Sequence, residues 1–142
     1  MAINTQKVVV GGIVGGIVFA ALDFLVNGVL MADQNAAALN ALNPALAENV
    51  QGGSVVAAFV ALDFLFAILL VWTYAAMRPR FGPGPKTAMV AAVQVWLVAL
   101  FLYAGMTFMG MWTWNYFFKG SVVFLAIMLI VSYVGAMLYK EE

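Results

Sequence analysis

The chain has 142 residues, enough for one ordinary domain, and 66% of them are hydrophobic while only 8% are charged. A soluble domain of this size is about half apolar and about a quarter charged, so this chain lacks the polar surface of a water-soluble enzyme. Six basic residues balance six acidic ones without any histidine, which leaves no positive surplus for binding nucleic acid. The absence of cysteine excludes disulfides and thiolate chemistry. The composition therefore indicates an integral membrane protein.

Four long apolar stretches lie between the charged residues, at about 8–31, 54–77, 87–111 and 120–139. Each has the roughly 20 residues that an α-helix needs to cross about 30 Å of hydrocarbon. The stretches are too long for barrel strands and do not alternate in polarity. The sequence predicts an all-α integral membrane protein, with one transmembrane domain over residues 1–142 and four helices in an antiparallel bundle.

The basic residues predict the orientation of these helices. Lys7 precedes the first stretch, three basic residues crowd the connection 78–86, and Lys140 follows the last stretch. The loop 32–53 contains neither Lys nor Arg. The positive-inside rule therefore places both termini and the 78–86 hairpin in the cytoplasm, and the 32–53 loop outside. Because the hairpin is dense in Pro and Gly, we expect it to be a tight turn that ends both flanking helices.

The connection 32–53 contains a run of Ala and Leu before Pro44. This run is compatible with an extension of the first helix or with a short interfacial helix that ends before the proline.

An internal repeat places two carboxylates inside the membrane. The segment FAALDFL at 19–25 recurs as FVALDFL at 59–65, so each copy puts an aspartate within an apolar helix. Since the two helices run in opposite directions, Asp23 and Asp63 both fall about 5 Å to the outer side of the bilayer centre. Tyr103 falls near the same level. We expect these three side chains to form an intramembrane polar layer.

Several roles for the two aspartates remain open at this point. An aspartate at the centre of a membrane helix costs about 3 kcal/mol, so it faces the bundle interior, a wet cavity or a partner. In the first, each aspartate is neutral and hydrogen-bonds across the bundle. In the second, the two aspartates share one proton or bind a cation. In the third, the pair of aspartates contacts a basic residue of another protein.

Small and polar residues follow one side of the first helix. Gly12, Gly16, Ala20, Asp23 and Asn27 succeed one another at steps of 4, 4, 3 and 4 residues. Such a face permits close backbone contact between helices. This face has two interpretations. In one it packs against helices of the same chain, and in the other it is a docking face for a second subunit.

Aromatic residues gather between the third and fourth stretches, where Trp112, Trp114 and Tyr116 are interpreted as an outer aromatic belt that anchors the chain at the interface. Contact with a bound lipid, quinone or pigment is the alternative interpretation. Without histidine or cysteine the chain has few acid–base, nucleophilic or metal-binding groups, so we expect neither a metal site nor catalysis by this chain alone.

The segment WTYAAMRPRFGPGPKTA at 72–88 resembles a hairpin of uncharacterised small bacterial four-helix membrane proteins, a family without an assigned activity. The end of the first helix, NGVL at 27–30, and the ADQ that follows at 32–34 are similar to theirs as well. The similarity covers roughly the first two thirds of the chain and fades after Val95. The resemblance implies an address in the bacterial inner membrane and supplies no functional residues.

Two functions are compatible with these patterns. The first is an accessory, non-catalytic subunit that stabilises a larger bacterial membrane complex by helix packing. Such a complex would be an electron-transfer assembly, photosynthetic or respiratory, and its other integral membrane subunits and the lipid bilayer would be the partners. The alternative is a small oligomeric transporter that conducts protons or cations with Asp23 and Asp63.

Overall fold

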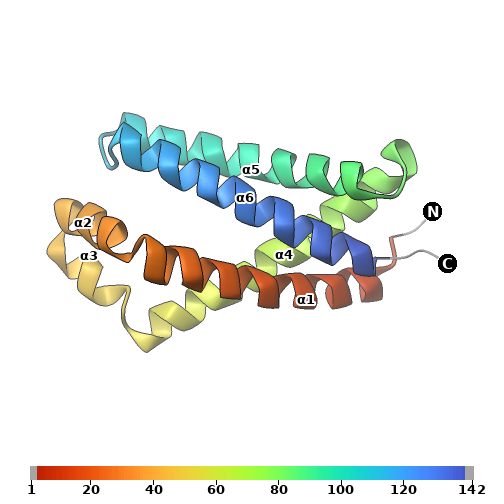
Figure 1. The fold of residues 1–142 in the computed structure, drawn as a ribbon, viewed down its shortest axis with the longest axis horizontal. Coiled ribbons are helices and arrows are strands. Elements are labelled where there is room, and N and C mark those ends of the chain that lie inside the picture. Colours follow the sequence, from red (N-terminus) through yellow and green to blue (C-terminus); the bar gives the residue numbers. More distant parts are fainter. Residues whose placement is uncertain (1–2, 140–142) are drawn as a thin grey trace.

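The computed structural model describes residues 3–139, and over that range every regular element is a helix (Figure 1). In chain order the elements are α1 (Thr5–Asp23), the π-helix η1 (Phe24–Leu30), α2 (Ala32–Leu42), α3 (Pro44–Asn49), α4 (Gly53–Phe81), α5 (Pro85–Phe108) and α6 (Trp114–Leu138).

Four segments are long and apolar enough to cross a membrane, namely Thr5–Leu30, Gly53–Phe81, Pro85–Phe108 and Trp114–Leu138. The shortest has 24 residues, which at 1.5 Å per residue is about 36 Å, more than the thickness of the hydrocarbon core. Large apolar side chains on these helices point outward, and Phe101 and Leu102 are 67% and 70% exposed. The prediction of an all-helical, multi-pass membrane protein with four spanning helices is confirmed.

The helices meet in a defined order. α1 packs against α4 and α6, α5 packs against α6 and α4, and α4 also contacts α6. Figure 1 shows α6 between α1 and α5, while α4 passes from the α3 side of the molecule to the start of α5. Two buried clusters fill the interior, one around Val8, Val71 and Tyr74, and the other around Phe19 and Met128.

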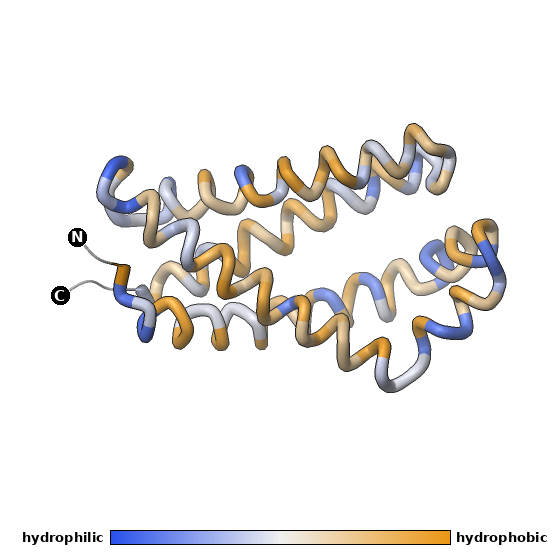
Figure 2. Tube along the Cα trace, turned by 180° about the vertical axis from the view of Figure 1, so that it is seen from behind, coloured by the Kyte–Doolittle hydropathy of each residue, from blue (hydrophilic) through white to orange (hydrophobic). Residues whose placement is uncertain are grey.

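The two ends of the molecule differ. One end carries α2 and α3, and we call it the α2–α3 end. The other carries the link between α4 and α5, and we call it the hairpin end. At the hairpin end the Tyr139 hydroxyl accepts a hydrogen bond of 3.1 Å from the backbone N–H of Asn4, which ties the first helix to the last. Figure 2 shows hydrophobic residues along the long helices and hydrophilic stretches mainly toward the two ends.

The link between α4 and α5 is shorter than the 78–86 hairpin expected from the sequence. α4 continues through Pro79 to Phe81, and only residues 82–84 connect it to α5. A proline removes one backbone hydrogen bond from a helix without forcing it to end. The turn comes instead at Gly82 and Gly84, whose φ angles of 79° and 124° lie in a region that favours glycine.

α6 begins earlier than its hydropathy suggests. It starts at Trp114 because Thr113 is its N-cap, and the Thr113 hydroxyl accepts a hydrogen bond of 3.2 Å from the Tyr116 N–H. The aromatic segment that the sequence places in a connection is therefore largely the first turns of a helix.

The 32–53 segment also folds into helices. α2 ends at Leu42, before Pro44, and α3 begins at that proline, with the Asn43 side chain capping it through a 3.0 Å bond from the Ala45 N–H.

Candidate functional site

Two carboxylates from neighbouring helices lie together inside the spanning region. Asp63 is in α4 and only 7% exposed, whereas Asp23 is half-buried at the last residue of α1. α1 packs against α4, the helix that carries Asp63. α1 and α4 come this near because Gly16 lets the ring of Phe64, the residue after Asp63, lie against the α1 backbone. The pair is the chemical centre of the candidate site.

The helical geometry changes directly after Asp23. Residues 24–30 form a π-helix, and the Met31 N–H donates to the Val26 carbonyl, five residues back, at 2.7 Å. π-helical turns are rare and are frequent at functional sites. Inside this turn the Asn27 side-chain amide donates a 2.7 Å hydrogen bond to Oδ1 of Asp23. Asn27 thereby fixes the orientation of the Asp23 carboxylate.

A second asparagine connects this turn to α6. The Asn35 amide on α2 donates to the Asn27 backbone carbonyl at 3.0 Å. Its Oδ1 accepts a 2.8 Å hydrogen bond from the Tyr116 hydroxyl on α6. Hydrogen bonds thus join Asp23, Asn27, Asn35 and Tyr116 in a line that runs toward the α2–α3 end, and the buried Asp63 lies at its inner end beside the half-buried Asp23. We call these five residues the polar line.

The sequence did not point to Asn35 or to the role of the Tyr116 hydroxyl. Asn35 lies eight residues after Asn27, and only the break between η1 and α2 at Met31 lets its side chain reach back. Hydropathy carries no sign of that break.

Tyr103 lies elsewhere. Its ring packs against Trp112 and Phe117, with ring centroids 6.2 and 5.1 Å away, and its hydroxyl lies beside Gly120. Among residues 3–139 no hydrogen bond joins this hydroxyl to Asp23 or Asp63. Tyr103 therefore does not contact the two aspartates through a hydrogen bond, because α5 packs against α4 and α6 on the side away from α1 (Figure 1).

The glycine face of α1 is covered by the chain itself. A Cβ on Gly12 would lie 2.8 Å from the Ile68 Cα, and one on Gly16 would lie 2.7 Å from Cγ of the Phe64 ring. Ala20 is half-buried on the same helix, and Asn27 is exposed with its amide bonded to Asp23, so the covered part of this face is the part around Gly12 and Gly16. Of the two interpretations of this face, the structure shows packing within the chain. Gly12 and Gly16 do not offer a docking surface to another subunit.

The aromatic residues form one connected cluster at the α2–α3 end. The rings of Trp112 and Tyr116 are 5.4 Å apart, and Trp114 lies 5.5 Å from Phe117. In the described part of the chain, the indole N–H of Trp112 is buried and has no hydrogen-bond acceptor. Native proteins rarely leave such a buried donor without an acceptor.

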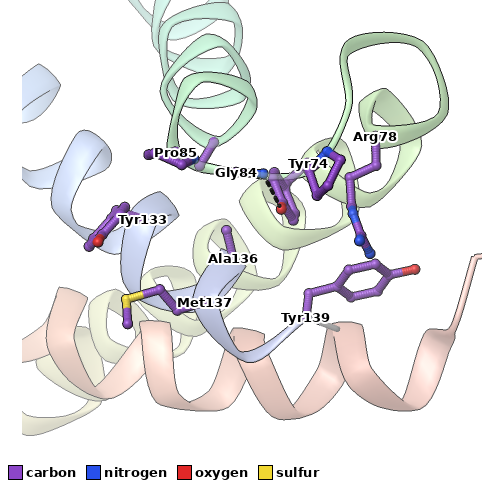
Figure 3. A pocket seen from close by; sticks show the side chains of 10 residues that line it. Tyr74, Arg78, Gly84, Pro85, Tyr133, Ala136, Met137 and Tyr139 are labelled. Atoms are coloured by element: carbon purple, nitrogen blue, oxygen red, sulfur yellow. Dashed lines mark hydrogen bonds between the residues drawn. The ribbon is translucent and has the colours of Figure 1, made fainter. Parts of the chain in front are cut away.

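A pocket of about 390 Å³ lies at the hairpin end (Figure 3). The Arg78 guanidinium reaches along it and lies 5.9 Å from the Tyr74 ring centroid and 5.3 Å from that of Tyr139. The Tyr74 hydroxyl accepts a 3.1 Å hydrogen bond from the Gly84 N–H, drawn as the dashed line in Figure 3. Cation–π contacts of this kind are worth roughly 0.5–2 kcal/mol each. The arrangement holds the end of α6 against α4 and the glycine turn.

Comparison of the chain with protein-family models, with curated proteins and with solved structures gives no match. The geometry of the aspartate pair and the polar line is therefore the basis on which a function is proposed.

Proposed function

We propose that the chain is a small proton transporter that takes up protons on Asp23 and Asp63 from the side of the membrane on which α2 and α3 lie. The observation that carries this proposal is the polar line, which leads from that end of the molecule to a carboxylate that is 7% exposed. Intramembrane acids mark ion and proton pathways in many membrane proteins.

Protons suit this pair better than larger cations. The basic residues of the four spans lie near the ends of their helices, as Lys7, Arg78 and Lys119 do, so no lysine or arginine faces the aspartates from the middle of a described span. Two adjacent carboxyl groups avoid mutual repulsion by holding one proton between them. A proton binds to a single carboxyl oxygen, whereas a metal cation needs several oxygen ligands around it. Among the described residues, no cluster of three or more acidic groups occurs.

The polar line reaches only one end of the molecule. Toward the hairpin end the helices are sealed by fully buried apolar side chains, including Leu70, Val71 and Met128. A continuous pore does not fit this arrangement. The proposal is therefore a carrier, in which release to the other side requires a second arrangement of the helices.

The test is proton uptake into proteoliposomes that contain a pH-sensitive dye and carry a potassium-diffusion potential. Wild type is expected to acidify or alkalinise the lumen according to the sign of the potential, and Asp63→Asn is expected to remove the signal. Asp33→Asn is the matched control, because Asp33 is an exposed aspartate in the first turn of α2. Flux equal to that of empty liposomes, or undiminished flux in Asp63→Asn, refutes the proposal. In a second set, choline replaces potassium and sodium and an imposed pH gradient drives the flux, which separates proton transport from alkali-cation transport.

The accessory-subunit hypothesis has less support. It rests on small-residue and aromatic surface available for packing and on the lack of catalytic groups, and Gly12 and Gly16 of that small-residue surface are covered by α4. Electron transfer and photosynthesis have no observation in their favour among the described residues.

We further propose that both termini and the hairpin end face the cytoplasm of a bacterial inner membrane, because Arg78, Arg80 and Lys86 lie at that end. The natural chain has no cysteine, so single cysteines report cleanly on sidedness. Asn40→Cys on α2 is expected to react with an impermeant maleimide added to intact cells, and Lys86→Cys only after permeabilisation. The reverse pattern refutes this orientation.

A further inference from the structure

A groove of about 370 Å³ lies at the α2–α3 end, between α2 and the beginning of α6. One wall is the Gln34, Ala37, Ala38 and Ala41 face of α2, whose small side chains leave the space open. The other wall includes Trp112, Tyr116 and Lys119. Only the Tyr116 hydroxyl belongs to the polar line, so most of this groove has no role in the proton site.

The groove has the chemistry of an anion site. Lys119 is exposed and is the one charged residue among the ten described residues that line it. Thr113 and Asn115, at the N-terminus of the 25-residue helix α6, also line it. The first N–H groups of a helix lack partners within the helix, and together with the helix dipole they attract an anion.

A buried donor provides a second, independent indication. The Trp112 indole N–H is inaccessible and finds no acceptor among residues 3–139. A buried donor without a partner costs about 1–3 kcal/mol, which favours a bound molecule that supplies an acceptor oxygen. Trp112 also lines the groove, so a rotation of the indole ring would turn this N–H toward a molecule bound there.

The surroundings of the groove are apolar and exposed. On α6 next to it, Phe118 is 60% exposed and Trp114 is 45% exposed. Aromatic residues at the end of a spanning helix lie at the level of the lipid headgroups. A molecule with a phosphate in the groove would therefore have room for an acyl chain along α6.

We propose that this groove binds the phosphate of a phospholipid from the leaflet at the α2–α3 end, with Lys119 and the start of α6 contacting the phosphate and an acyl chain lying against Phe118. The bound lipid bridges α2 to α6 alongside the Asn35–Tyr116 hydrogen bond. This inference concerns a different site from the aspartate pair and does not depend on proton transport.

The test is native mass spectrometry of the detergent-solubilised full chain titrated with dioleoyl phosphatidylglycerol. Dioleoylglycerol, with the same chains and no phosphate, is the matched ligand control. One phospholipid is expected to stay bound, and Lys119→Gln is expected to weaken its binding about tenfold, as loss of a charged hydrogen-bonding partner predicts. Ala38→Leu fills the groove without changing the charge and is expected to abolish retention.

Two variants serve as controls. Lys86→Gln removes a positive charge at the hairpin end, and Ala45→Leu adds the same bulk at an exposed position of α3; both are expected to bind like wild type. Equal retention of dioleoylglycerol, full competition by inorganic phosphate alone, or unchanged binding in Ala38→Leu refutes the proposal. Asp63→Asn is expected to keep its lipid, so this inference and the proton-transport proposal fail separately.

Discussion

Gly11→Ala tests the packing of α1 on α6. A methyl group on Gly11 would lie 2.7 Å from the backbone carbonyl oxygen of Gly135, and backbone cannot rotate aside as a side chain does. Replacing glycine by alanine within a helix gains about 1 kcal/mol from backbone entropy. Overpacking a tight interface costs about 1–3 kcal/mol. The net effect expected for Gly11→Ala is therefore a loss of up to about 2 kcal/mol in the free energy of unfolding.

The same substitution at two other glycines separates these two effects. A Cβ on Gly15, one turn further along α1, would lie 3.4 Å from the nearest atom, which is ordinary contact, and one on Gly105 would meet nothing within 4 Å. Both variants are expected to be as stable as wild type or more stable, with Gly105→Ala gaining about 1 kcal/mol. Unfolding by SDS in mixed micelles, followed by circular dichroism, measures all three. If Gly11→Ala is as stable as Gly105→Ala, α1 and α6 do not approach each other as closely as the contact between Gly11 and Gly135 requires.

Three further predictions concern single interactions and use the same unfolding assay. Ser132→Ala removes the buried 2.7 Å hydrogen bond that the Ser132 hydroxyl on α6 donates to the Ala88 carbonyl on α5. The free energy of unfolding is expected to fall by about 0.6 kcal/mol, the average for such bonds in membranes. A variant as stable as wild type contradicts this prediction. Tyr74→Phe leaves the Gly84 N–H without its acceptor and is expected to cost about 1–3 kcal/mol, so an unchanged stability would show that water replaces the hydroxyl. Gly84→Ala places a side chain on a residue with a φ of 124°, although a Cβ there would meet no other atom. The free energy of unfolding is expected to fall by about 1–3 kcal/mol because of this backbone strain. A gain in stability would argue against this turn geometry.

Hydropathy predicted the four spanning helices because each must be apolar over its whole length, whatever its neighbours are. Helix ends were less predictable, since they depend on local groups such as the Thr113 cap and on whether a helix tolerates Pro79. The position of a residue along the membrane normal also follows from counting. Counting gives one depth to Asp23, Asp63 and Tyr103, but it does not show which side chains meet, and Tyr103 packs against Trp112 and Phe117.

Asn35 was beyond sequence reasoning for a related reason. Its contacts require the chain to turn at Met31 and to bring α2 back toward α6, and no local pattern of residues encodes that return. The glycine face was recognised, but small residues permit contact with any helix, so their spacing alone did not identify α4 as the partner.

The contact between Gly11 and Gly135 also constrains how the molecule is able to move. With no side chain between the two backbones, α1 and α6 approach closely at this point, whereas near the other end they are linked through the Asn35 side chain of α2. A tilt of α1 that kept the glycine contact would pivot about this point. Its displacement would grow along the helix and be largest beyond Asp23, so such a tilt would strain the bridge at Asn35 before it separated the glycine pair.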